Sequence, residues 1–135
     1  MKIQHLGLVT GNVDETLAAL GLDRSAIQEA VFDPVQKNTL YFIHLPENDL
    51  WLELVQPMDE TASTHKFVKR FGMGLHHLGF SCDDFETPAE KYREMPGAFE
   101  LGRYEITVRS FGGRIKTLFF AIQGLIVEFV KNEDR

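Results

Sequence analysis

Short stretches in which apolar and polar positions alternate run along the chain, and this pattern is typical of β-strands with one buried face. The first is residues 3–9, where the alternation places His5 on the odd-numbered face and Leu6 and Leu8 on the other. Seven more strands are predicted, at residues 30–32, 39–44, 50–55, 75–82, 98–105, 115–122 and 125–131. Helical segments are predicted at residues 13–20, 64–71 and 87–95.

Local residues predict where two of the helices begin and end. Asn12 is a good N-cap, with Glu15 three residues later as its capping-box partner, and Gly21 is suited to the C′ position of the same helix. Ser63 is the expected cap of the second helix.

The predicted elements occur twice. His-Leu-Gly stands at His5 and again at His77, 72 residues later (77 − 5), and an acidic turn and a helix follow each copy. Each half then closes on an apolar strand with one glutamate, Glu53 or Glu128. A repeated unit decides the architecture of a chain. We therefore predict one α+β domain spanning residues 1–135, built from two paired β-α-β-β-β modules. They occupy about residues 1–57 and 75–135, with a connector at 58–74, and form one curved mixed sheet with helices on its outer face.

Composition narrows the partners and the compartment. The formal charge of −6 over 135 residues speaks against nucleic acid or anionic lipid as a partner. No run of about 18 apolar residues is present, so we expect no membrane span. The first strand begins at the N-terminus, so we expect no signal peptide. Cys82 is the single cysteine, which fits a reducing, cytoplasmic setting.

Four residues carry the candidate chemistry. His5 and His77 are each followed two positions later, on the same face, by a glycine, which leaves room beside the ring. Glu53 and Glu128 stand among apolar neighbours, and a buried carboxylate is costly unless a proton, a cation or a metal neutralises it. Mixed nitrogen and oxygen ligation suits Zn, Ni, Co, Fe or Mn. The alternatives are hydrogen-bonded core histidines and glutamates on an edge facing water. Recurrence at matched positions favours a four-residue metal site.

The motifs also resemble a family. The two His-Leu-Gly segments, residues 52–57 (LELVQP), 74–80 (GLHHLGF) and 124–129 (GLIVEF) are similar to the vicinal oxygen chelate superfamily over nearly the whole chain. The similarity is greatest to its glyoxalase I and methylmalonyl-CoA epimerase branch. The resemblance implies a divalent metal ion (Zn, Ni, Co or Mn) held by His5, Glu53, His77 and Glu128. His77 carries over because it matches His5 in the repeat, whereas His76 faces the helix side and is expected to be structural.

The chain departs from the epimerases at one chemically important place. Those enzymes have a further glutamate base on the third strand of the first module, where this chain has Tyr41 near the expected position. Arg103, Arg109, Arg114 and Lys116 surround the Gly112-Gly113 turn and are candidates to hold an anionic substrate group. Cys82 is expected to be an inert thiol.

Three functions remain open at this point. The first is a lyase or isomerase that polarises a carbonyl at the metal, stabilises an enediolate and moves a proton, with Glu128 or Glu53 as the base. Its expected substrate is a 2-oxo thiol conjugate or an acyl-CoA thioester, and the resemblance implies a homodimer. The second is a metal-free protein that binds a small molecule such as an antibiotic, in an aromatic cleft of Trp51, Tyr41 and Phe119. The third is an Fe(II) extradiol-type dioxygenase.

Overall fold

The computed structural model describes residues 1–134, and within them it has eight strands and three α-helices. The strands are β1 (Lys2–Thr10), β2 (Glu29–Asp33), β3 (Asn38–Leu45), β4 (Leu50–Pro57), β5 (Met73–Ser81), β6 (Ala98–Val108), β7 (Gly113–Ile122) and β8 (Leu125–Asn132). The helices are α1 (Val13–Ala19), α2 (His65–Phe71) and α3 (Glu86–Arg93), with short 3-10 turns η1 (Arg24–Ala26), η2 (Pro46–Asn48) and η3 (Arg109–Phe111). Each predicted strand and helix is present. β5 begins at Met73, inside the predicted connector.

Hydrogen bonds join the strands into one eight-stranded sheet in the order β2-β3-β4-β1-β5-β8-β7-β6. The sheet is mixed, because β5 and β8 are parallel whereas β2–β3, β3–β4, β6–β7 and β7–β8 are antiparallel. The α+β class and the two β-α-β-β-β modules joined by α2 are therefore confirmed. Among the described residues, no helix combines the length and the apolar character needed to cross a membrane.

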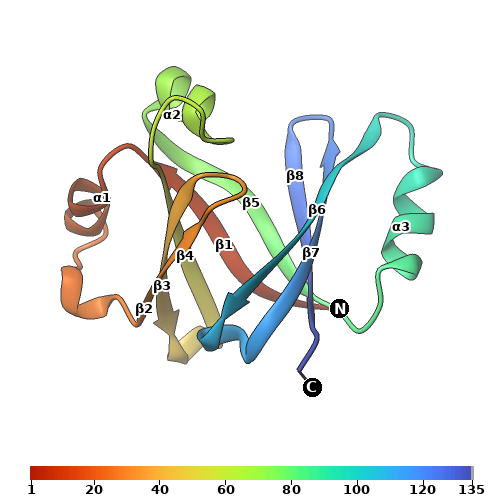
Figure 1. Ribbon diagram of the computed structural model, residues 1–135, viewed down its shortest axis with the longest axis horizontal. Helices are drawn as coiled ribbons and strands as arrows, with labels where there is room; N and C mark the ends of the chain where they lie inside the picture. The colour runs from red at the N-terminus through yellow and green to blue at the C-terminus, as the bar shows by residue number, and fades with distance from the viewer. Residues whose placement is uncertain (135) are drawn as a thin grey trace. The chain divides into compact units, whose positions relative to one another are not determined.

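The chain divides into two compact units, one of residues 6–76 and one of residues 1–5 with the chain from His77 onward. In the first unit, β2, β3 and β4 form an antiparallel ladder, and α1 lies beside it (Figure 1). The buried cluster of this unit is Val13, Leu17, Ile43, Leu52 and Leu54. Leu6 and Leu8 pack against this cluster, as the alternation in the first strand predicts.

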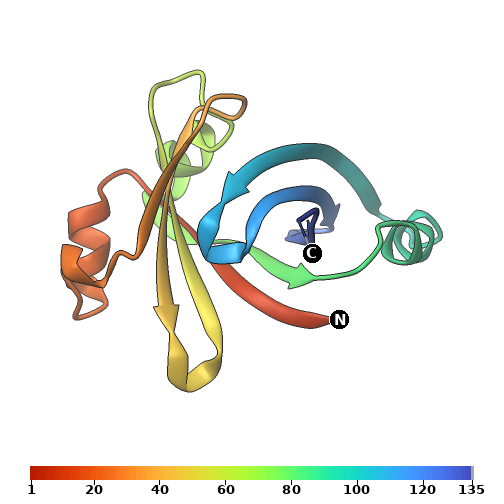
Figure 2. The same ribbon diagram turned by 60° about the horizontal axis from the view of Figure 1, so that its bottom comes forward.

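The second unit repeats this construction with β5 to β8 and α3. β6 and β7 run side by side over ten residue pairs with one irregularity between Glu100 and Gly102, and Figure 2 shows how strongly both strands curl. The buried cluster here is Ala89, Leu118, Phe120, Val127 and Phe129. Phe80 of β5 packs against it, again on the predicted side.

Asn12 is confirmed as the cap of α1 and Gly21 as its C′ residue, whereas Glu15 as the capping-box partner and Ser63 as the cap of α2 are wrong. The Asn12 side chain accepts a hydrogen bond of 3.1 Å from the Glu15 amide, although the Asn12 amide donates to the Thr10 hydroxyl rather than to Glu15. Gly21 follows the helix at φ 72°, a conformation that favours glycine. Ser63 caps nothing: α2 begins at His65, and the Ser63 hydroxyl is engaged with two side chains of the preceding segment, Gln36 and Asn38.

The Asn12 cap gives a first test. Asn12→Ala removes an acceptor for an amide that the helix itself cannot satisfy, so the free energy of unfolding should fall by about 1 kcal/mol. Urea unfolding followed by circular dichroism measures this difference. Asn48→Ala, at an exposed position in η2, is the matched control and should change stability little. Equal effects of the two substitutions would contradict the capping role.

Candidate metal centre

The two repeated histidines are buried on the odd-numbered faces of their strands. His5 of β1 is 0% exposed and His77 of β5 is 3% exposed. Burial along β1 alternates, with His5, Gly7 and Val9 buried and the intervening residues half-exposed, as the sequence predicts. The strand period alone therefore brings both imidazoles to the interior.

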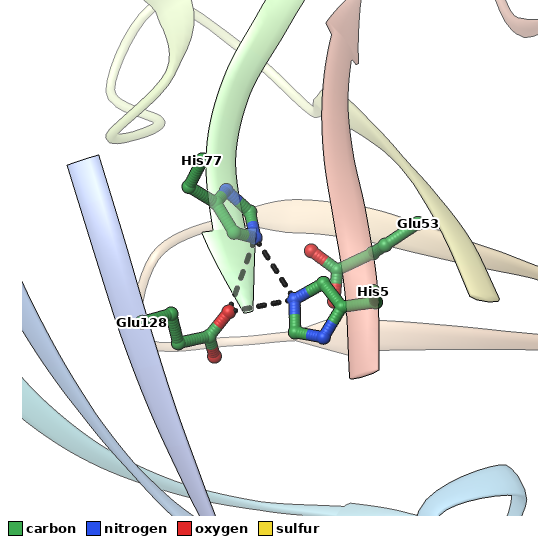
Figure 3. Close-up of side chains that lie close together, drawn as sticks. All are labelled: His5, Glu53, His77 and Glu128. Atoms are coloured by element: carbon green, nitrogen blue, oxygen red, sulfur yellow. Dashed lines mark hydrogen bonds and ion pairs between the residues drawn. The ribbon is translucent and has the colours of Figure 1, made fainter. Parts of the chain in front are cut away.

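Three ligand atoms converge within the second unit (Figure 3). His5 Nε2 lies 2.9 Å from Glu128 Oε1, His77 Nε2 lies 3.1 Å from the same oxygen, and the two Nε2 atoms are 3.1 Å apart. Metal–ligand distances of about 2.0–2.2 Å allow two ligands of one ion to lie up to about 4.4 Å apart. All three pairs are well inside that limit. A single chain therefore brings together one carboxylate and two imidazoles with the spacing of a metal site.

The electrostatics of Glu128 are those of an ionised buried carboxylate. Burial raises the pKa of Glu128, but His5 and His77 more than offset that effect and bring the pKa to about 2. A buried anion is stable only when positive charge or hydrogen-bond donors face it. The two imidazole edges supply this partnership, and a divalent cation bound by the same three atoms would also do so.

The register of β5 and β8 explains why the His5 ring can come so close to Glu128. Gly79 is the residue paired with Glu128, and a Cβ placed on Gly79 would lie 2.0 Å from His5 Cε1 and 2.3 Å from its Nδ1. The His5 ring thus occupies the space that any larger side chain would fill. The sequence predicts that Gly79 leaves room for an imidazole ring, and this contact shows that it does so for His5. On the other side, Phe119 is paired with Glu128 and meets His77 edge-on at 5.7 Å between ring centroids.

Glu53, the fourth predicted ligand, lies in β4 of the first unit and is 7% exposed. It is paired with the fully buried Phe42, much as Glu128 is paired with Phe119. His5, His77 and Glu128, the three buried side chains of the second unit, could hold a metal ion. Their donor chemistry, nitrogen and carboxylate oxygen, fits a divalent transition metal.

Tyr41 does not stand where the sequence argument placed it. Residues paired across an antiparallel ladder point to the same face, and Tyr41 is paired with Leu54 whereas Phe42 is paired with Glu53. Tyr41 accordingly packs against the buried cluster beneath α1. Tyr41 is therefore excluded as a substitute base beside Glu53 and as a wall of an aromatic cleft on that face. The Trp51 ring stacks on the His44 ring, with 4.5 Å between the centroids.

The predicted cationic cluster is largely engaged at the surface. Arg103 pairs with Glu100, Arg114 with Asp134 and Lys116 with Glu133, and all of these side chains except the half-buried Glu133 are exposed. Three of the four predicted cations thus take part in ion pairs at the surface. Burial and two aspartates raise the pKa of Cys82 to about 11, so its thiol is protonated and unreactive at neutral pH, as predicted. The ring of His76 meets Phe67 of α2 edge-on at 5.4 Å, a packing contact.

A family model matches residues 4–108, which is more than three quarters of the chain, and describes the glyoxalase/bleomycin resistance protein/dioxygenase superfamily. The chain belongs to this superfamily. The sequence resemblance to the vicinal oxygen chelate proteins is thereby confirmed. One curated relative, the uncharacterized protein YqjC of Bacillus subtilis (strain 168), is 23% identical over 86 residues, covering 61% of this chain and 58% of YqjC. The chain thus spans somewhat over half of that relative.

Several solved structures share this fold at low sequence identity. Methylmalonyl-CoA epimerase from Mycobacterium tuberculosis gives a TM-score of 0.76 at 17% identity, covering 96% of this chain and 87% of the epimerase. Hypothetical protein BH1468 from Bacillus halodurans C-125 gives 0.76 at 19%, covering 99% and 96%. A variant of the Streptomyces coelicolor epimerase in complex with 2-nitronate-propionyl-CoA gives 0.74 at 20%, covering 98% of each chain.

The contact between Gly79 and His5 gives a second test. Gly79→Ala places a methyl group 2.0 Å from His5 Cε1, so the ring must move. Overpacking of this kind lowers the free energy of unfolding by about 1–3 kcal/mol. The matched control is Gly124→Ala, where an added Cβ meets nothing within 4 Å. Thermal unfolding and the Zn(II) dissociation constant of both variants measure the effect. A Gly79→Ala protein with wild-type stability and metal affinity would show that the His5 position is wrong.

Proposed function

We propose that this protein is a divalent-metal-dependent isomerase or epimerase that transfers a proton next to a polarised carbonyl. The observation that carries the proposal is the buried triad of His5, His77 and Glu128, whose three ligand atoms lie within 3.1 Å of one another. Glu53 is proposed as the fourth ligand, from its place in the repeat. The ion is Zn, Ni, Co or Mn.

In this proposal some residues bind the metal ion and one accepts the proton. A bound divalent ion supplies a Lewis acid, which stabilises negative charge on a substrate oxygen. His5 and His77 serve only as ligands, because their ring edges already point at the shared carboxylate. Glu128 or Glu53 accepts the proton from the acidified C–H, and a positioned base contributes about 10²–10⁴-fold. We favour Glu128, which must turn away from the imidazoles before it can do so.

The substrate is proposed as an acyl-CoA thioester or a 2-oxo thiol conjugate. Support comes from the structural neighbours, which include an epimerase in complex with methylmalonyl-CoA and one in complex with 2-nitronate-propionyl-CoA. Homodimer formation and a cytoplasmic location remain predictions from the sequence.

The metal requirement separates two adjacent histidines. His77→Gln should weaken Zn(II) or Co(II) binding by about ten- to a hundredfold, because it removes a ligand whose loss no neighbour replaces. His76→Gln is the matched control and should retain wild-type affinity. Metal content after chelator treatment and reloading, followed by competition titration, measures both. A wild-type protein that takes up none of Zn, Ni, Co or Mn would overturn the enzyme proposal in favour of a metal-free binding protein.

Proton transfer is tested by solvent exchange. Methylmalonyl-CoA and the hemithioacetal of a 2-oxoaldehyde, incubated with loaded enzyme in deuterium oxide, should exchange the hydrogen next to the carbonyl, as followed by NMR. Glu53→Gln and Glu128→Gln should differ, because an amide oxygen can still bind a metal but cannot accept the proton. The base variant keeps its metal and loses exchange. Oxygen consumption without exchange would indicate a dioxygenase instead, and exchange retained in both variants would place the base elsewhere.

A further inference from the structure

The two ring nitrogens of His5 have different partners. Nε2 faces Glu128 and His77, whereas Nδ1 lies 3.1 Å from the side-chain oxygen of Gln4. An amide oxygen can only accept a hydrogen bond, so Nδ1 carries a proton in this contact. An ion held at Nε2 takes the lone pair of that nitrogen, so Nδ1 is then the nitrogen that carries the ring proton.

Two contacts restrict the plane of the same ring. Phe111 of η3 stacks on it at 5.5 Å between centroids with 25° between the planes, and the Cα of Gly79 lies against the ring in the position described above. The Asn132 side chain donates a hydrogen bond to the Phe111 carbonyl and so ties η3 to the end of β8. The ring therefore has little freedom to tilt.

Stacking leaves one ambiguity, because a 180° turn of the ring about its Cβ–Cγ bond keeps the same plane. That turn would move Nε2 into the place of Cε1, away from the ligand position, without loss of the contacts to Phe111 or Gly79. A hydrogen bond at Nδ1 distinguishes the two orientations, since only one of them presents a nitrogen to Gln4.

We propose that Gln4 is the positioning residue that directs His5 Nε2 to the metal. This inference rests on the proposed metal site. Adjacent side chains on a strand point to opposite faces, so the contact depends on the length of glutamine, which reaches back to its own neighbour. The repeat-related position in β5 is His76, whose ring contacts Phe67 of α2.

Three substitutions separate length from hydrogen bonding. Gln4→Leu keeps the approximate shape and removes the acceptor, Gln4→Asn keeps the amide on a shorter side chain, and Gln4→Glu keeps both the acceptor and the length. Gln4 is half-buried and lines an open surface cavity with Lys2 and Lys91, so these changes leave no sealed void. His76→Gln serves as the control at the repeat-related position.

Two readouts are needed, neither of which is activity. NMR of the metal-free protein reports the orientation of the His5 ring, because only the turned ring brings its Hδ2 proton next to Gly79, and chelator competition gives the Zn(II) and Co(II) dissociation constants. Wild type and Gln4→Glu should show the single orientation without that contact, and equal affinity. Gln4→Leu and Gln4→Asn should lose that preference and bind about tenfold or more weakly.

The inference is overturned if Gln4→Leu and Gln4→Asn keep both the wild-type orientation of the His5 ring and the wild-type affinity. Should Gln4→Leu fail to fold, as judged by circular dichroism, the comparison of Gln4→Asn with Gln4→Glu decides the question. A wild-type protein that binds no metal removes the proposed function. The NMR measurement on the metal-free protein then still tests whether Gln4 orients His5.

Discussion

One carboxylate, that of Glu128, is buried against two imidazoles, and much of the second unit is arranged to allow it. Desolvation alone would raise its pKa, and the contacts to His5 and His77 reverse that effect. Such contacts need strands from distant parts of the chain at a fixed register. The parallel pairing of β5 with β8 sets Gly79 beside Glu128, and the absent side chain of Gly79 admits the His5 ring. One residue of slip between these strands would turn Glu128 to the opposite face.

The repeat supplies the same frame twice but surrounds it differently. Glu53 is paired with Phe42, which is fully buried, whereas Glu128 is paired with Phe119, which is half-exposed beside His77. Gln4 contacts the first histidine, while the equivalent His76 packs on α2. The strand period and the glycine positions are thus the same in both modules. The neighbours of the histidines and glutamates differ between the modules. Asymmetry of this kind gives two similar glutamates the opportunity for different roles.

The sequence was sufficient for the fold class, the modules and the inward faces of His5 and His77, because these follow from periodicity and repetition. The sequence was insufficient where the register of a hairpin decides which side of the sheet a residue faces. The turn at η2, with Asp49 at φ 48°, sets Leu45 opposite Leu50 and so places Tyr41 under α1. The sequence analysis missed the contacts of Gln4 and Phe111 with His5 for another reason. The Gln4 contact runs against the strand alternation, and the Phe111 contact joins segments over a hundred residues apart. No sequence signal marks either.

The low pKa of Glu128 sets a limit on how it can act. A general base works best when its pKa lies near the pH of the reaction, and a carboxylate with a pKa of about 2 binds a proton poorly. The same contacts that make Glu128 a stable buried anion therefore oppose its use as a base. Release from His5 and His77 removes their effect, and burial then raises the pKa toward a useful range. If Glu128 is the base, ligand release and proton transfer must be one coupled event. If it stays in place, the proton must go to another base, for which Glu53 is the proposed candidate.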